Sequence, residues 1–292
     1  MTKQVKPDFG TVGMALSCTL FLEQALINYR DYTRFIDNET IDIIHKWNKH
    51  LLYVLKDSKY DTLLGDTGKK LVQYTSEDKK FITRCITTAK DVTTQSLYYV
   101  LRFDESVGFL RDKYRNNPRL TFCDLGVGLS PLPIVFQTQY NIKGIYCIDV
   151  VPEIADIYQT TAKYCDIKSP EFIDWESAQT MGKSHQISTI VSVGCLPHIP
   201  MELQKKYLQS INALFDYFFI EIKYATTLEN KEKNDKAFCL HELQKLRMDV
   251  KNVTDVESEM IHRAIRYLRN FIRAKPNRID FVSEYRSLFL SR

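Results

Sequence analysis

Residues 122–133 read FCDLGVGLSPLP, an apolar run that passes into a glycine-containing turn and then into a second apolar segment. The first run predicts a strand and the segment after Pro131 predicts a helix. Gly126 and Gly128 permit a sharp backbone turn and leave room for a ligand, because neither carries a Cβ. The stretch therefore predicts a strand, a turn that approaches a ligand, and a helix.

A carboxylate ends the next predicted strand. Residues 144–149 read GIYCID, and Asp149 stands 23 positions after Gly126. An acid at this place is suited to accept both ribose hydroxyls of an adenosine-containing ligand. A G-x-G pair alone also occurs in purely structural turns. Its combination with the strand, the helix and the spaced acid favours a nucleotide or S-adenosylmethionine (SAM) site over a structural turn.

The chain after Asn116 alternates short apolar runs with helical segments, which predicts a mostly parallel sheet with right-handed crossovers. The predicted strands cover residues 120–125, 144–150, 187–193 and 217–222, with a weak fifth at 171–174. The predicted helices cover residues 132–139, 153–165, 201–214 and 240–247. Two further segments, residues 250–256 and 279–290, complete the predicted sheet, and a long helix that reaches Lys275 lies between them in the sequence. The fold class is α/β, with a helical domain in front.

The first third of the chain follows a helical period instead. Asn38 is placed to cap a helix whose apolar positions recur at three and four residues over 41–55. Residues 64–68 predict a turn, and Thr75 with Asp78 resembles a capping box that opens another helix.

The two patterns predict two domains, a helical cap over residues 1–115 and a SAM-binding domain over residues 116–292. His45 and His50 do not share a helix face as zinc ligands would, and we expect them to be solvated.

Composition describes an ordinary globular protein. Of 292 residues, 44% are hydrophobic, and a net charge of +4 is too small to indicate nucleic-acid binding by itself. The seven cysteines are scattered and form no C-x-x-C pair, which is typical of reduced thiols in a cytoplasmic protein. No apolar run reaches the length of a membrane span, so we expect no membrane association. The oligomeric state stays open.

Residues 124–128, read with Asp149, resemble motif I and the following acidic position of class I SAM-dependent methyltransferases. Residues 187–200 (ISTIVSVGCLPHIP) resemble the fourth strand of that family and its active-site loop, and residues 218–221 (FFIE) resemble the fifth strand. The resemblance implies a Rossmann-like class I sheet of seven strands, SAM as the cofactor, and a methyltransferase activity.

The resemblance also implies a set of cofactor contacts, residue by residue. It places Asp124 near the methionine amino group, Gly126 and Gly128 beneath the cofactor, Asp149 on the ribose, Asp174 at the adenine amine, Trp175 beside the ring, and Gly194 in the active-site loop.

Two further residues are candidates for catalysis. His198 follows the fourth predicted strand, where a neutral imidazole is able to take a proton from an acceptor hydroxyl or amine. The alternative is a loop histidine without a chemical role. Glu221 ends the fifth strand and is a candidate to orient an acceptor, or it is a structural carboxylate. The loop 194–200 contains no carboxylate, so we expect no metal requirement.

Ser130 replaces the third glycine of the motif, and this departure keeps several functions open. A SAM-dependent methyltransferase acting on the O or N of a small molecule leads, because a helical cap can close over a compact acceptor and exclude water. The S-P-L ending also resembles ribosomal-RNA methyltransferases of aminoglycoside resistance and aminocarboxypropyl transferases of the nicotianamine synthase type. A degenerate, non-catalytic binding protein is the remaining alternative.

The hypothesis that RNA is a partner is supported by four arginines along the C-terminal predicted helix. Because acidic residues flank them, we expect this face to be solvated surface rather than an RNA-binding site. The four are Arg263, Arg266, Arg269 and Arg273.

Overall fold

The computed structural model describes residues 10–73, 92–142, 144–256, 258–259, 262 and 285–292. The chain forms two compact units, and each is described by itself. The helical unit comprises residues 1–100, 128–141 and 149–170, and the sheet unit comprises residues 101–127, 142–148 and 171–292. A domain boundary near residue 115 stays a prediction.

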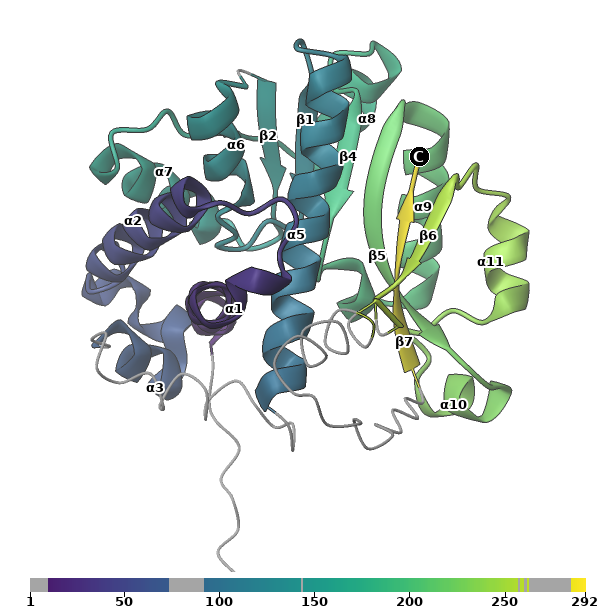
Figure 1. The fold of residues 1–292 in the computed structure, drawn as a ribbon, viewed down its shortest axis with the longest axis horizontal. Coiled ribbons are helices and arrows are strands. Elements are labelled where there is room, and N and C mark those ends of the chain that lie inside the picture. The colour runs from purple at the N-terminus through teal and green to yellow at the C-terminus, as the bar shows by residue number, and fades with distance from the viewer. Residues whose placement is uncertain (1–9, 74–91, 143, 257, 260–261, 263–284) are drawn as a thin grey trace, which may run out of the picture. The chain divides into compact units, whose positions relative to one another are not determined.

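The sheet unit holds the seven strands that the described residues form, in the order β3-β2-β1-β4-β5-β7-β6 (Figure 1). They are β1 (Thr121–Leu125), β2 (Gly144–Ile148), β3 (Glu171–Phe172), β4 (Thr189–Ser192), β5 (Tyr217–Ala225), β6 (Asn252–Asp255) and β7 (Tyr285–Ser291). Neighbouring strands among β1 to β5 pair in parallel, whereas β7 is antiparallel to both β5 and β6. The expected seven-stranded, mostly parallel sheet is confirmed.

The order of the strands positions the site. From β1 the chain moves to β2 and β3 on one side, and it then crosses to β4 on the other side of β1. Open α/β sheets bind ligands at such a switch point, outside the carboxyl ends of the strands. A ligand-binding site is therefore expected at the loops that follow β1 and β4.

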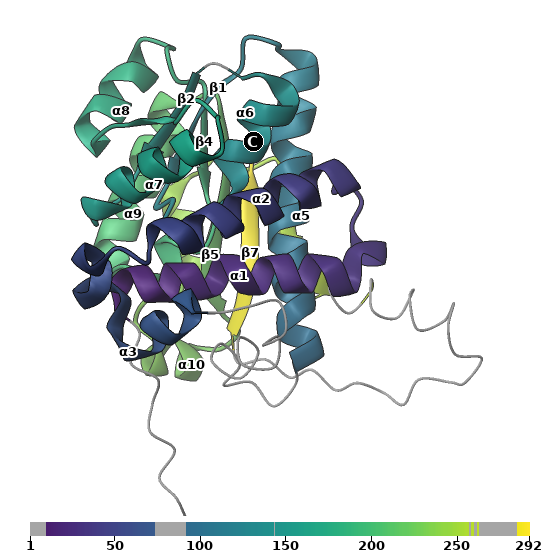
Figure 2. The same ribbon diagram turned by 90° about the vertical axis from the view of Figure 1, so that its left-hand side faces the viewer.

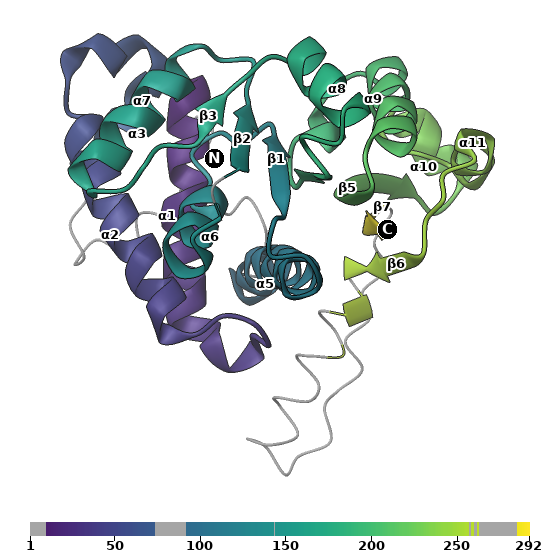
Figure 3. The same ribbon diagram turned by 90° about the horizontal axis from the view of Figure 1, so that it is seen from above.

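Side chains along β5 alternate between the two faces of the sheet, and helices cover both faces. Phe218 and Ile220 are buried in the cluster that Ala178 and Leu208 share, on the side of two helices. Phe219 points the other way, and its ring stacks at 5.2 Å on Phe109. Figure 3 shows α5 on one side of the sheet and α8 with α9 on the other. The helices of this unit are the second part of α5 (Val92–Asn116), α8 (Trp175–Lys183), η3 (Leu196–His198), α9 (Met201–Leu214), α10 (Leu228–Lys233) and α11 (Leu240–Leu246).

The helical unit is built around two long helices that lie against each other, α1 and α2 (Figure 2). Helix α1 also packs on α3, and α2 packs on α6 and α7. Leu16, Trp47, Leu51 and Tyr158 are fully buried in this unit. Its elements are α1 (Thr11–Tyr29), η1 (Arg30–Tyr32), α2 (Asn38–Val54), η2 (Ser58–Tyr60), α3 (Asp61–Val72), the first part of α5, α6 (Leu132–Tyr140) and α7 (Glu153–Tyr164).

Two expectations for the first third of the chain need correction, and two further predictions lie outside the described residues. Asp37, not Asn38, caps α2, because its carboxylate accepts the Thr40 N–H at 2.8 Å. Residues 64–68 lie inside α3, which is kinked where Gly65 adopts φ 62°. The capping box predicted at residues 75–78 and the arginine face at residues 263–273 lie outside the described residues.

The prediction that no segment reaches the length of a membrane span is also wrong. Residues Thr11–Tyr32 are long and apolar enough, with a mean hydropathy of 1.2. Within this segment, 61% of the apolar 18-residue window is buried inside the protein. The segment therefore matches a core helix as well as it matches a membrane span.

Candidate functional site

The turn after β1 is fixed to the end of β2 and to the loop after β4. The N–H groups of Gly126 and Val127 both donate to the Ile148 carbonyl, at 2.8 and 3.1 Å. Gly126 has φ +75°, and a Cβ there would lie 2.3 Å from Cys195 Sγ. Both the left-handed backbone and the approach of Cys195 therefore require glycine at this position.

Asp124 lies one residue before the end of β1. Its residue is only 5% exposed, and it stands between Cys147 of β2 and Val191 of β4 in the sheet register. This places a carboxylate at the carboxyl end of the central strand. Its contact with a methionine amino group stays a prediction.

The second half of the turn belongs to the helical unit and contacts Asp149 directly. Gly128 has φ +51°, and its N–H donates to Asp149 Oδ2 at 2.8 Å. The other oxygen, Oδ1, accepts the Val151 N–H at 3.0 Å. A carboxylate oxygen has two lone pairs, so each oxygen of this half-buried side chain keeps acceptor capacity. The structure thus brings the Gly128 N–H and the Asp149 carboxylate together, and a contact of Asp149 with ribose hydroxyls stays a prediction.

Two buried aromatic residues hold the carbonyl groups that follow Gly128. Trp47 Nε1 donates to the Leu129 carbonyl at 3.4 Å, and the Tyr158 hydroxyl donates to the Ser130 carbonyl. The two rings lie 4.6 Å apart. The helical period over residues 41–55 places Trp47 on an apolar stripe but does not predict this contact, because such a stripe indicates burial and not hydrogen bonding.

Ser130 has a local role in place of the third glycine. Its Oγ accepts the Leu132 N–H at 3.3 Å, at the first residue of α6. The hydroxyl thereby satisfies one of the N–H groups that the start of a helix leaves without an intrahelical partner.

In the sheet unit, Glu221 fixes the loop after β4. Its Oε2 accepts the Gly194 N–H at 2.8 Å and pairs with Arg102 Nη2 at 2.9 Å. Gly194 has φ +80°, and a Cβ there would lie 2.1 Å from Arg102 Nη2. The Glu221 side chain is 2% exposed and that of Arg102 is 16% exposed. These contacts give Glu221 a positioning role; its contact with an acceptor stays a prediction.

Arg102 is the functional residue that sequence reasoning missed in this unit. It comes from α5, more than a hundred residues before Glu221, and no motif surrounds it. Only the folded chain brings the two side chains together.

His198 lies at the end of the short helix η3 and is exposed. Partial loss of water around the imidazole lowers the pKa of His198 from 6.5; the Glu221 carboxylate raises it, and Arg102, Lys223 and Lys236 lower it. The ring is therefore neutral at pH 7, which is the form that accepts a proton.

Asp174 and Trp175 lie where β3 passes into α8. Asp174 is exposed and caps the helix, because its Oδ1 accepts the Ser177 N–H at 2.7 Å. That hydrogen bond lowers the pKa of Asp174. The Trp175 ring meets Tyr207 edge to face at 4.6 Å. Contacts of these residues with an adenine stay predictions.

Within the described ranges, no group of three or more histidine, cysteine, aspartate or glutamate side chains is arranged to hold a metal ion. The six cysteines in those ranges are free thiols, of which Cys123, Cys147 and Cys165 are buried. The core position expected of the cysteines therefore holds for these three, whereas Cys18, Cys195 and Cys239 are half-buried.

No family model matches the sequence, and no curated protein matches it. Among solved structures, the chain is similar to magnesium protoporphyrin IX methyltransferase from Synechocystis PCC 6803, bound to S-adenosylhomocysteine (SAH). That match has 17% identity, covers 78% of this chain and 99% of the other, and has a TM-score of 0.44.

Two other solved structures are similar at lower identity. Geranyl diphosphate C-methyltransferase from Streptomyces coelicolor A3(2) matches with 9% identity over 70% of this chain and 85% of the other, with a TM-score of 0.45. Mycolic acid cyclopropane synthase CmaA1 matches with 11% identity over 64% and 84%, with a TM-score of 0.42.

Proposed function

We propose that this chain is a SAM-dependent methyltransferase. The observation that carries the proposal is the hydrogen bond from the Gly128 N–H to Asp149 Oδ2 at 2.8 Å. It holds a carboxylate against the glycine turn, with acceptor capacity left on both oxygens for a pair of ribose hydroxyls.

The two loops of the sheet unit support the same proposal. Cys195, which begins the segment after Gly194, packs directly against Gly126. This contact holds the loop after β4 at the turn after β1. Glu221, which accepts from Gly194 and pairs with Arg102, fixes the same loop to β5 and α5. Such a rigid arrangement keeps binding groups in place before a ligand arrives, which lowers the entropy cost of binding.

SAM supplies, when bound, a methyl group on a positively charged sulfur. An acceptor oxygen or nitrogen that takes this methyl group must lose a proton, and His198 is the residue that we assign to receive it. A well-placed general base contributes about 10²- to 10⁴-fold to a rate. Because its pKa is lowered, His198 is unprotonated at neutral pH and ready for this role.

We further propose that the acceptor is a small molecule methylated on oxygen or nitrogen, in a cytoplasmic setting. The presence of a helical unit supports this choice, since helices are able to close over a compact acceptor and exclude water from it. RNA is the alternative acceptor that the sequence keeps open.

The experiment is to incubate the purified chain with SAM labelled on its methyl group and with two cell fractions, small metabolites and RNA. The proposal predicts label in the metabolite fraction, reduced about a hundredfold by His198→Ala. Label that enters RNA alone would replace the small-molecule acceptor. SAM that binds without any label transferred, in every fraction tested, would support a non-catalytic binding protein.

A further inference from the structure

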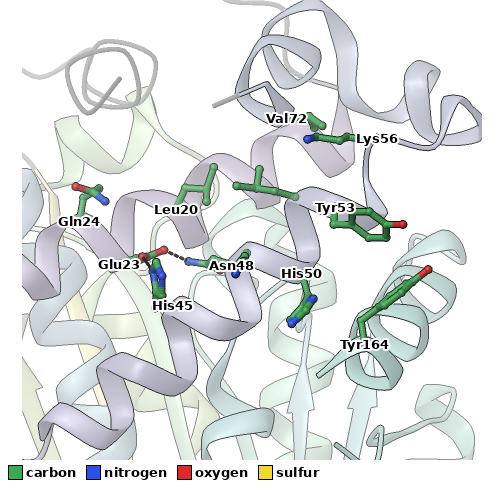
Figure 4. Close-up of a pocket in the computed structure, with 12 residues that line it drawn as sticks. Leu20, Glu23, Gln24, His45, Asn48, His50, Tyr53, Lys56, Val72 and Tyr164 are labelled. Atoms are coloured by element: carbon green, nitrogen blue, oxygen red, sulfur yellow. Dashed lines mark hydrogen bonds and ion pairs between the residues drawn. The ribbon is translucent and has the colours of Figure 1, made fainter. Parts of the chain in front are cut away.

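The helical unit contains a cavity that is lined by α1, α2, the end of α3 and the last residue of α7 (Figure 4). Its volume is about 510 Å³, within the range of cavities that hold small molecules. His45 and Lys49 line it, and each stands two residues from Trp47 on α2. Two helical residues turn about 200°, so the cavity opens on the face of α2 opposite the glycine turn.

One wall of the cavity is a fixed polar network. Glu23 is buried at 7% exposure, and its two oxygens accept from His45 Nδ1 and Asn48 Nδ2, each at 2.7 Å. Thr19 holds Asn48 in turn, through its hydroxyl at 3.1 Å. With Nδ1 of His45 occupied, Nε2 is the ring nitrogen left for a ligand. His45 is thus solvated, as expected, but it is also held by a buried acid.

A second wall is aromatic and open to water. Tyr53 and Tyr164 meet edge to face at 5.1 Å, and the His50 ring lies nearly parallel to Tyr164, 9° apart. The two tyrosines are 59% and 50% exposed. Exposed aromatic rings that gather at a cavity provide a stacking surface for a planar ligand.

The cavity is positively charged. Lys49 and Lys56 line it and are exposed, and neither forms an ion pair within the part of the chain that the structure describes. Glu23, the acid of the lining, is already bound by His45 and Asn48. Burial lowers the pKa of His50, and the charges of Lys46 and Lys49 lower it further.

We propose that this cavity binds a planar aromatic molecule that carries a carboxylate or a phosphate. The ring lies against Tyr53, His50 and Tyr164, and the anionic group lies toward Lys49 and Lys56. His45, held by Glu23, donates from Nε2 when it is protonated. The site is independent of the SAM site.

The test is a fluorescence titration of the full chain with three naphthalene probes. 1-Naphthyl phosphate and 1-naphthoate carry the anion, and neutral 1-naphthol lacks it. We expect both anions to bind about tenfold tighter than 1-naphthol, since two charge-assisted contacts are available. The tighter of the two anions identifies the headgroup that the site prefers.

Variants separate the two walls. Lys49→Gln combined with Lys56→Gln is expected to weaken the anions about tenfold and to leave 1-naphthol unchanged. Tyr164→Ala is expected to weaken all three probes about fivefold, because the stacking surface is lost. Lys245→Gln, on exposed α11, is the matched control and changes nothing. Circular dichroism checks that each variant is folded.

Asp149→Ala gives the last comparison, because it removes the proposed ribose acceptor and is expected to leave probe binding unchanged. The proposal is overturned if no anionic probe binds at millimolar concentration, or if 1-naphthol binds as tightly as the anions. It is equally overturned if the double lysine variant binds the anions as tightly as the parent, or if Asp149→Ala weakens probe binding.

Discussion

Replacing Glu221 with glutamine removes one charge from a buried pair and keeps the shape of the side chain. Glu221 is 2% exposed and Arg102 is 16% exposed, with 2.9 Å between their charged atoms. Removing one partner of a buried pair costs about 3–5 kcal/mol, because the other charge stays desolvated without compensation. Glutamine retains a carbonyl oxygen that can accept from Gly194 or Arg102, so we expect about 3 kcal/mol.

Thermal and urea unfolding, followed by circular dichroism, measure this change. A loss of about 3 kcal/mol corresponds to a melting temperature lower by roughly 6–12 °C for a chain of this size. Glu202→Gln is the matched control, since the Glu202 side chain is 82% exposed and pairs with Lys205 only at the surface. We expect less than about 0.5 kcal/mol for that variant.

A double-mutant cycle then separates the pair from other effects of the substitution. Arg102→Met combined with Glu221→Gln leaves no unpaired charge, so the double variant should be more stable than the sum of the two single losses, by about 1–3 kcal/mol. Strictly additive losses, or a Glu221→Gln variant as stable as the Glu202→Gln control, would refute the positioning role of this pair.

Three other predictions concern the turn and the proposed base. Gly126→Ala should lower the free energy of unfolding in urea by about 2–4 kcal/mol, because the backbone there is left-handed and the new Cβ would clash with Cys195. Adding Cys195→Gly should restore part of this loss. Trp47→Phe should cost about 1–3 kcal/mol and weaken SAM binding, because Leu129 loses its donor and a void remains; calorimetry showing an unchanged affinity would contradict this. For His198, whose pKa lies below 6.5, methyl transfer should be constant above pH 7 and fall as acid protonates the ring, and this titration should vanish in His198→Gln.

The fold was predictable because its strands are marked by apolar runs of the right length. The predicted strand at residues 187–193 is observed as Thr189–Ser192, and the strand predicted at 279–290 is observed as Tyr285–Ser291. The residues at which helices begin were less predictable. Asp37 and Asn38 are both good caps and are adjacent, so only the observed hydrogen bond to Thr40 distinguishes them.

The site was predictable where its residues are close in sequence or regularly spaced. The spacing of the strand–turn–helix unit places Asp149 after the next strand, whereas its hydrogen bond with Gly128 is visible only in the structure. Arg102 of α5 meets Glu221 of strand β5, and the pocket lined by Glu23 and His45 lies between helices, so both depend on tertiary packing. A helical period predicts which face is buried, but it does not predict which polar groups meet across two helices.

The most direct measurement is a calorimetric titration of the chain with SAM, comparing the parent with Asp149→Ala. Losing this charged hydrogen-bond partner of the ribose costs about 1.5–3 kcal/mol, so we expect affinity to fall roughly ten- to hundredfold. Glu153→Ala, an exposed acid at the start of α7, is the matched control and should bind as the parent does. A parent that binds SAM with Asp149→Ala weakened in this way supports the site. A parent without measurable binding at millimolar SAM, or an Asp149→Ala variant as tight as the parent, contradicts it.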